Sequence, residues 1–200
     1  MDETTGRALD EYLVSLSQAG SVEALDGLAR RWTPRLLRYA ARMLAGAGDS
    51  ADAARDVVQD TWISAIRGLR GLRDPAQFPA WIYGIATRRC VDTLRARIRR
   101  RRLDANVAMG DASEPAASSS SPERQIDLAN AIRGLPPIHR AAVHLFYRED
   151  LSVEEIASVL GIPAGTVKSR LHHAREAIRR QLDSAAPVPT EGDSRKRGIS

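Results

Sequence analysis

A short run of polar and basic side chains near residue 170 has the composition of a DNA-reading helix. Helical periodicity places it opposite or beside an apolar stripe that begins at Val167 and Leu171, so these side chains face outward. Hydroxyls at a helix N-terminus can bind phosphate, and lysine or arginine can bind guanine edges or phosphates. The predicted contacts are Thr166, Lys168, Ser169, Arg170, His172 and His173.

The residues before this run encode a tight turn between two helices. Ser152 and Glu155 have the spacing of a capping box, in which hydroxyl and carboxylate each accept from a free backbone amide. Gly161 suits a left-handed helix exit, and Pro163 suits the entry of the next helix. This pattern predicts a helix-turn-helix with its second helix in the major groove. A plain two-helix corner with a solvated basic face is the alternative, and the turn chemistry favours DNA binding.

A second polar face, earlier in the chain, is acidic. Asp56, Gln59 and Asp60 share one side of a predicted helix by their three- and four-residue spacing. Negative charge repels DNA, so this face suits docking on a basic protein surface. An ordinary solvated face is the alternative, because spacing alone does not exclude it.

A third candidate surface combines aromatic rings with arginines. Ile82, Ala86 and Cys90 recur every four residues and predict a core stripe, so Cys90 is expected to be a buried hydrophobe. On another face the arginines can follow phosphates while rings hold unstacked bases. For Phe78 and Trp81 core packing is an equal alternative, and for Tyr83 packing is favoured. The predicted single-strand contacts are Phe78, Trp81, Arg88, Arg95 and Arg99.

The composition favours a binding protein over an enzyme. The 200 residues carry a net charge of +5, with six arginines between positions 95 and 102, which suggests a polyanionic partner. The sequence has no phosphate-cradling glycine loop, nucleophile elbow or metal-ligand spacing, and the adjacent His172 and His173 point about 100° apart. We therefore expect no catalysis, no cofactor and no metal. A polar N-terminus and the lack of a long apolar run predict a cytoplasmic protein without membrane insertion.

Periodicity predicts an all-α fold of two small helical domains joined by a flexible linker. Aromatic residues are only 4% of the chain, so the core must be largely aliphatic. Pro34 is expected either to divide or to kink its helix. The expected segments are a first domain over 1–102, a linker over 103–122, a second domain over 123–183 and a disordered tail over 184–200. The expected helices cover about 9–16, 25–44, 51–69, 80–103, 122–134, 137–148, 153–160 and 163–182.

Three stretches, in this order, resemble signatures of the extracytoplasmic-function (ECF) group of the sigma-70 family of RNA polymerase sigma factors. They are residues 56–62 (DVVQDTW), 78–86 (FPAWIYGIA) and 165–171 (GTVKSRL). The resemblance covers roughly residues 20–182. It implies that the first domain is conserved region 2, the second is region 4, and the protein directs polymerase to promoters and promotes their opening.

The resemblance also implies residue roles. Asp56, Gln59, Asp60 and Thr61 match the stretch that docks on the largest subunit of core RNA polymerase. The loop 72–78 and the helix after it match the elements that capture the promoter −10 element. The run from Thr166 to His173 matches the helix that faces the −35 element, and the linker would run toward the RNA exit channel. Implied partners are core RNA polymerase (its largest and second-largest subunits), promoter DNA and an anti-sigma factor.

Two positions depart from the family pattern. Arg88 stands where asparagine is frequent, which makes a phosphate contact there more plausible than a base contact. His173 stands where arginine is frequent, so its charge can vary near neutral pH. The competing interpretation is a free-standing helix-turn-helix regulator, which would leave the acidic face and the arginine-rich helix without a purpose.

Overall fold

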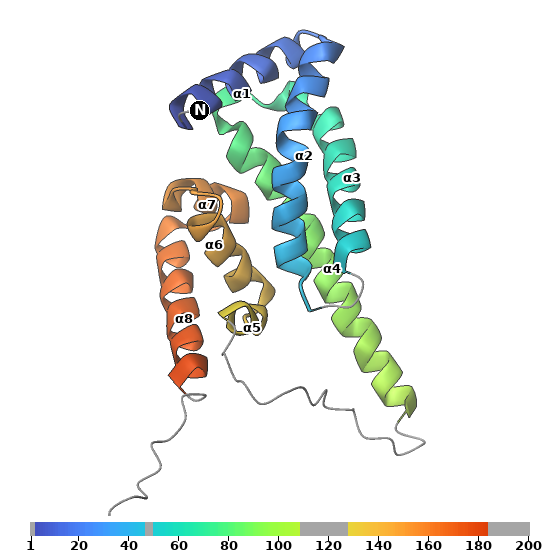
Figure 1. The fold of residues 1–200 in the computed structure, drawn as a ribbon, viewed down its shortest axis with the longest axis vertical. Coiled ribbons are helices and arrows are strands. Elements are labelled where there is room, and N and C mark those ends of the chain that lie inside the picture. Colours follow the sequence, from blue (N-terminus) through green and yellow to red (C-terminus); the bar gives the residue numbers. More distant parts are fainter. Residues whose placement is uncertain (1–2, 47–49, 109–127, 184–200) are drawn as a thin grey trace, which may run out of the picture.

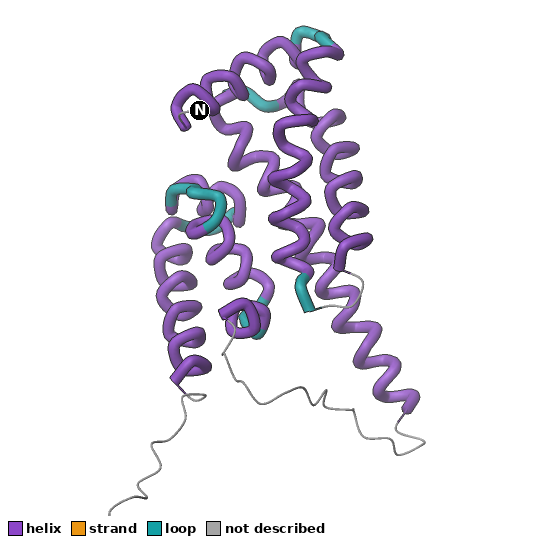
Figure 2. The backbone as a smooth tube through the Cα atoms, viewed as in Figure 1, coloured by secondary structure: helices purple, strands orange, loops and turns teal. Residues whose placement is uncertain are grey.

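The computed structural model describes residues 3–46, 50–108 and 128–183, and these residues form helices and turns but no strand (Figure 2). Figure 1 shows two groups of helices side by side. The N-terminal domain contains α1 (Glu3–Gln18), α2 (Val22–Leu44), α3 (Ser50–Gly68) and α4 (Phe78–Ala108), with short 3-10 turns at Leu69–Gly71 and Pro75–Gln77. The C-terminal domain contains α5 (Leu128–Arg133), α6 (Pro137–Tyr147), α7 (Val153–Leu160) and α8 (Ala164–Asp183).

The core of the N-terminal domain is organised around a few aromatic rings. Trp32 contacts Phe78 and Tyr83 edge-on, with ring centroids 5.3 and 5.6 Å apart, and Tyr83 meets Tyr39 at 5.2 Å. The Tyr39 hydroxyl shares a 2.7 Å hydrogen bond with Thr87. These contacts join α2 to α4, which fixes the orientation of the other faces of α4.

Helix α2 continues through Pro34 without a division. Its N-terminus is capped by Ser21, whose hydroxyl accepts from the Ala24 amide at 3.1 Å. Trp32, Leu36 and Tyr39 are all buried on one side of the helix. Packing of this stripe outweighs the single hydrogen bond that the proline removes, so the alternative of two helices is wrong.

Helix α4 is longer than the sequence pattern predicts. It begins at Phe78 and ends at Ala108, so residues 103–108 are helical and do not belong to the linker. The rest of the predicted linker lies outside the described residues, as does the tail 184–200. Cys90 is buried in the α4 stripe, as predicted. Burial raises the pKa of its thiol to about 12.

The two domains pack against each other. Helix α7 lies on α4, and α6 lies on α2 and α4. One continuous cluster of buried apolar side chains runs through both domains. In the part of the chain that the structure describes, no helix has the length and apolar character required to cross a bilayer.

Candidate nucleic-acid interface

The turn between α7 and α8 has the geometry that its sequence predicts. The Ser152 hydroxyl accepts from the Glu155 amide at 3.1 Å, and the Glu155 carboxylate accepts from the Ser152 amide at 2.7 Å. This completes the capping box of α7. Gly161 ends the helix in the left-handed region, with φ 63°, and its amide donates back to Ala157 and Ser158. The chain therefore turns sharply and presents α8 outward.

Helix α8 has one buried and one exposed side. Val167, Leu171 and Ala174 are buried against the rest of the C-terminal domain. Four of the predicted DNA contacts are exposed on the other side of the helix: Lys168, Ser169, His172 and His173. Lys168 has no carboxylate partner among the described residues.

The two remaining predicted contacts on α8 are half-buried. The Thr166 carbonyl accepts a hydrogen bond from the Ser169 hydroxyl at 3.1 Å, and this bond holds the Ser169 side chain in place. One guanidinium nitrogen of Arg170 is buried and has no hydrogen-bond partner among the described residues. Burial, and then the charge of Arg170, lower the pKa of His139 on α6. Arg170 thus leans toward α6, and only part of it is open to DNA.

A concave surface lies between α3 and α4, where the sequence predicts single-strand contacts. It is a cavity of about 390 Å³ that brings Trp81 and Arg88 together. Trp81 is half-buried at this surface, and Arg88 is exposed, with no carboxylate partner among the described residues. An aromatic ring beside an unpaired guanidinium can stack a base and neutralise its phosphate. The other lining residues are Ser64, Ile85, Arg89 and Asp92.

The position of the Trp81 ring depends on a glycine that the sequence analysis did not identify. A Cβ at Gly68, the last residue of α3, would lie 3.1 Å from the Trp81 ring. The absence of a side chain there lets the ring lie close to the end of α3. Arg89 was also missed: it donates to the Ser64 hydroxyl at 3.1 Å and so bridges the two helices that form the cavity.

Phe78 is not part of this surface. It is fully buried and packs edge-on against Trp32, because α4 begins at Phe78 and its first turn faces the core. The prediction of a DNA contact at Phe78 is therefore wrong. Arg95 and Arg99 are exposed on α4 beyond the cavity, so the positive surface continues along the helix.

The acidic face of α3 borders this cavity. Asp56, Gln59 and Asp60 are exposed, as their spacing predicts. The carboxylate of Asp60 lies 3.9 Å from the Arg89 guanidinium, which places the two surfaces edge to edge. Thr61 is fully buried, and its hydroxyl donates to the Val57 carbonyl at 2.7 Å. The prediction of a docking contact at Thr61 is corrected: this side chain belongs to the core.

The described residues contain no group of three or more side chains that could hold a metal ion. The rings of His172 and His173 are 5.7 Å apart and tilted, and both are exposed. Their placement suits contact with DNA. The predicted surfaces thus offer aromatic, hydroxyl, imidazole, guanidinium and carboxylate groups for binding. Within the described residues these groups do not form a metal-binding cluster.

The sequence matches two protein families in the order of the two domains. Residues 28–101 match Sigma-70 region 2, and residues 125–178 match Sigma-70, region 4. The first match contains the acidic face of α3 and the cavity at Trp81. The second contains α7, the turn after it and α8 as far as residue 178, so each candidate surface falls within a matched region.

Curated relatives extend over most of this chain. The ECF RNA polymerase sigma factor SigE of Mycolicibacterium smegmatis is 33% identical over 90% of this chain and 69% of its own length. The RNA polymerase sigma-H factor of Pseudomonas aeruginosa is 32% identical over 86% of this chain and 93% of its own. SigW of Bacillus subtilis, another ECF sigma factor, is 31% identical over 82% of this chain and 91% of its own.

Two solved structures share the fold of this chain. CnrH, in complex with the cytosolic domain of CnrY, has a TM-score of 0.64 and 25% identity, covering 88% of this chain and 98% of its own. RpoE of Bartonella quintana, in complex with the anti-sigma factor NepR, shares the fold with a TM-score of 0.59 and 24% identity, over 81% of this chain and 98% of its own. This chain belongs to the ECF group of the sigma-70 family of RNA polymerase sigma factors.

Proposed function

We propose that this sigma factor opens promoters by capturing an unstacked base in the cavity between α3 and α4. The observation that carries the proposal is the pairing of the Trp81 ring with the free Arg88 guanidinium in one concave surface. The volume of about 390 Å³ lies within the range of pockets that hold small ligands. A base that leaves the duplex stacks on Trp81, while Arg88 neutralises the adjacent phosphate.

The energetics of this step need no catalytic group. Unpairing a base costs a few kcal/mol, and stacking on an aromatic side chain contributes about 1–3 kcal/mol. Arg95 and Arg99 extend the positive surface and follow the displaced strand. Capture of the base therefore shifts the equilibrium toward open DNA, and we assign the protein a binding role without turnover.

The C-terminal domain binds duplex DNA at the −35 element through the exposed side of α8. Lys168 is the strongest candidate, because it is exposed near the helix N-terminus and unpaired among the described residues. The Arg170 guanidinium is half-buried, so it contributes less than its position in the sequence suggests. His172 and His173 lie farther along the same side and approach the phosphates.

Core RNA polymerase docks on the acidic face of α3, formed by Asp56, Gln59 and Asp60. This face is negative and exposed, and it adjoins the cavity through the Asp60–Arg89 contact. Docking there fixes the cavity at the point where the duplex opens. Since core polymerase and promoter DNA are both in the cytoplasm, we place the protein there too.

An anti-sigma factor is a further expected partner. RpoE of Bartonella quintana is seen with the anti-sigma factor NepR. By analogy, a protein that covers the α3 face or the α8 surface would silence this chain. Pull-down with the tagged full-length protein, followed by loss of transcription on addition of the captured protein, tests this expectation.

Run-off transcription with purified core polymerase and a pool of promoters from the source genome tests the function. We expect new start sites that require this protein. Asp60→Ala should abolish them by weakening polymerase binding while leaving −35 duplex binding intact. Duplex binding by the protein alone, without any protein-dependent start site, would contradict the proposal and favour a free-standing regulator.

A further inference from the structure

Helix α1 precedes the region 2 match, which begins at residue 28, yet it binds the connection between α3 and α4 (residues 69–77). Its last residue, Gln18, is half-buried. The Nε2 atom of Gln18 donates to the Leu69 carbonyl at 2.9 Å and to the Leu72 carbonyl at 2.7 Å. Both partners are acceptors, so the amide nitrogen must face them, and it has two N–H groups to donate. The donor capacity of this side chain is therefore used on the α3–α4 connection.

The two carbonyls lie at the ends of a short turn. Residues Leu69–Gly71 form a single 3-10 turn, which the Leu72 amide closes by donating to the Leu69 carbonyl at 3.1 Å. Leu72 is already extended, with φ −73° and ψ 106°, so the chain leaves helical geometry there. A 3-10 turn of this length has little stability of its own, because its hydrogen bonds are poorly aligned. Gln18 supplies an external support by binding a carbonyl at each end.

Helix α1 is itself firmly fixed on α2. The Asp10 carboxylate is almost fully buried and accepts from the Arg31 guanidinium on α2 at 2.8 Å. At the C-terminal end of α1, Gly20 has φ 103°, and the Ser21 amide donates to the Leu16 carbonyl at 3.0 Å. The Gln18 amide is thus held by a helix whose own position is set by the core.

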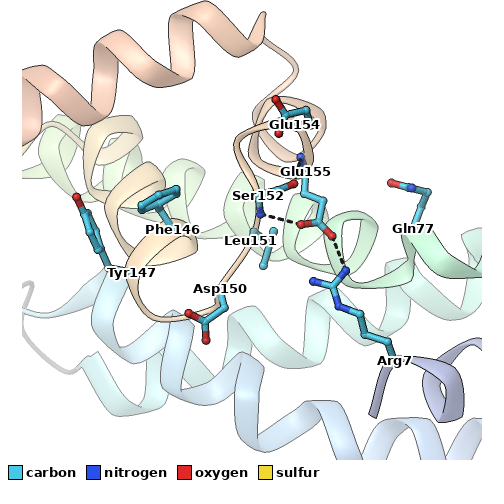
Figure 3. A pocket seen from close by; sticks show the side chains of 9 residues that line it. All are labelled: Arg7, Gln77, Phe146, Tyr147, Asp150, Leu151, Ser152, Glu154 and Glu155. Atoms are coloured by element: carbon cyan, nitrogen blue, oxygen red, sulfur yellow. Dashed lines mark hydrogen bonds and ion pairs between the residues drawn. The ribbon is translucent and has the colours of Figure 1, made fainter. Parts of the chain in front are cut away.

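The other end of α1 lies near the end of the same connection. Figure 3 shows Arg7 of α1 and Gln77 of the second 3-10 turn lining one pocket. Arg7 donates there to the Glu155 carboxylate at 3.0 Å. Helix α1 therefore follows the α3–α4 connection along its length, and Gln18 binds it at the end next to α3.

The turn that Gln18 holds comes directly after Gly68. A Cβ at Gly68 would lie 3.1 Å from the Trp81 ring, and this ring lines the cavity with Arg88. A turn that drifts would carry Gly68 toward the ring or away from it. Resting on the proposed function, we propose that Gln18 is a positioning residue for base capture: it fixes the turn after α3 so that Gly68 and Trp81 keep the cavity in the shape that stacks an unpaired base.

Promoter opening by two variants of the full-length protein tests this role. Gln18→Met keeps the length of the side chain but removes both donors, and Gln18→Glu replaces the donor nitrogen by an acceptor oxygen. We expect permanganate reactivity of the melted −10 thymines to fall about two- to tenfold in Gln18→Met, the effect of one lost hydrogen bond. The fall should be larger in Gln18→Glu, because its carboxylate repels both carbonyls. Binding to −35 duplex should be unchanged in both.

Ser17→Ala is the matched control. It removes a hydrogen bond within α1, from the Ser17 hydroxyl to the Leu13 carbonyl at 2.7 Å, and leaves the α3–α4 connection untouched. Its opening should equal that of the native protein. Native-level opening in Gln18→Met, or an equal loss in Ser17→Ala, would overturn the proposal.

A double variant separates positioning from general stability. If Gln18 acts through the Trp81 ring, Gln18→Met should cause no further loss of opening in a Trp81→Ala protein. The same fold-loss in the native and the Trp81→Ala backgrounds would show that Gln18 does not act through the ring. Normal opening by Trp81→Ala alone would contradict the proposed function and this inference with it. A defect in Trp81→Ala without one in Gln18→Met would overturn this inference alone.

Hydrogen exchange in the free full-length protein provides a readout that needs no DNA. The Leu72 amide closes the turn, so its exchange should be about two- to tenfold faster in Gln18→Met than in the native protein. The Tyr39 amide, in the buried part of α2, should exchange at the native rate. Equal acceleration at both amides would mean that the variant only destabilises the whole domain, and the positioning role would be refuted.

Discussion

The two surfaces that we propose to bind DNA differ in shape and in what supports them. The surface at Trp81 is a cavity between α3 and α4, and it depends on Gly68 and on the Arg89–Ser64 bridge. The surface on α8 is the exposed side of one helix, supported by a buried apolar stripe. A cavity can hold a base that has left the duplex, whereas a convex helix fits the major groove of an intact one.

The two domains also differ in their response to acid. The largest effect that we expect is a loss of stability of the C-terminal domain at low pH. All four histidines lie in the C-terminal domain. His144 is buried, and neither ring nitrogen has a hydrogen-bond partner among the described residues. Burial, and then the charges of Arg42, Arg140 and Arg148, lower its pKa to about 4.

Because the pKa of His144 is lower in the folded than in the unfolded protein, its neutral form stabilises the fold. Its contribution to the free energy of unfolding, up to about 3 kcal/mol, is complete above about pH 6.5 and is lost as the pH falls toward 4. Urea unfolding from pH 7 to pH 4 measures it. His144→Leu should show a shallower pH dependence. An unchanged dependence in this variant would contradict the assignment.

Trp81→Ala gives the next largest effect. Loss of base stacking removes about 1–3 kcal/mol, so promoter opening should fall roughly 5- to 150-fold. Permanganate reactivity of melted thymines measures opening, while a band-shift on −35 duplex should be unchanged. Trp81→Phe keeps an aromatic face and should retain most of the activity. If Trp81→Ala weakened −35 duplex binding as much as promoter opening, the separate roles of the two surfaces would be contradicted.

Lys168→Ala should have the opposite pattern. It removes one exposed cation from α8, so affinity for −35 duplex should fall about tenfold and the salt slope of binding should decrease by about one. Binding to core polymerase should be unaffected. Arg170→Ala is expected to cost less, because its guanidinium is half-buried. A larger loss in Arg170→Ala than in Lys168→Ala would contradict this ranking.

Gly68→Ala tests the finest detail and has the smallest expected effect. The new Cβ would lie 3.1 Å from the Trp81 ring, so the ring must shift by a few tenths of an ångström. We expect opening to fall about threefold while stability is kept, since alanine favours the helix. Gly71→Ala, where a Cβ meets nothing within 4 Å, is the control. Equal activity of the two variants would show that the ring position is unimportant.

Local chemistry made the helix-turn-helix predictable from the sequence. Ser152, Glu155 and Gly161 each act on backbone groups within a few residues, so their spacing was sufficient to predict the capping box and the turn. The exposure of Asp56, Gln59 and Asp60 followed from helical periodicity for the same reason. These features depend little on the packing of distant segments.

Features that depend on packing between helices were not predictable. Phe78 and Trp81 are three residues apart, and only the start of α4 decides that the first is buried and the second is half-exposed. Thr61 follows the acidic face in sequence but points into the core. Gly68 supports Trp81 across two helices, and no periodic signal marks such a contact. The packing of α7 on α4 likewise follows from no local pattern.

The most direct test of the separate roles of the two surfaces uses a promoter with a pre-melted −10 region. Run-off transcription is measured with Trp81→Ala and Lys168→Ala on this template and on the intact duplex. The account predicts that pre-melting restores Trp81→Ala to near the native level and leaves Lys168→Ala defective. Equal rescue of both variants, or no rescue of Trp81→Ala, would contradict the claim that the cavity captures the opened strand.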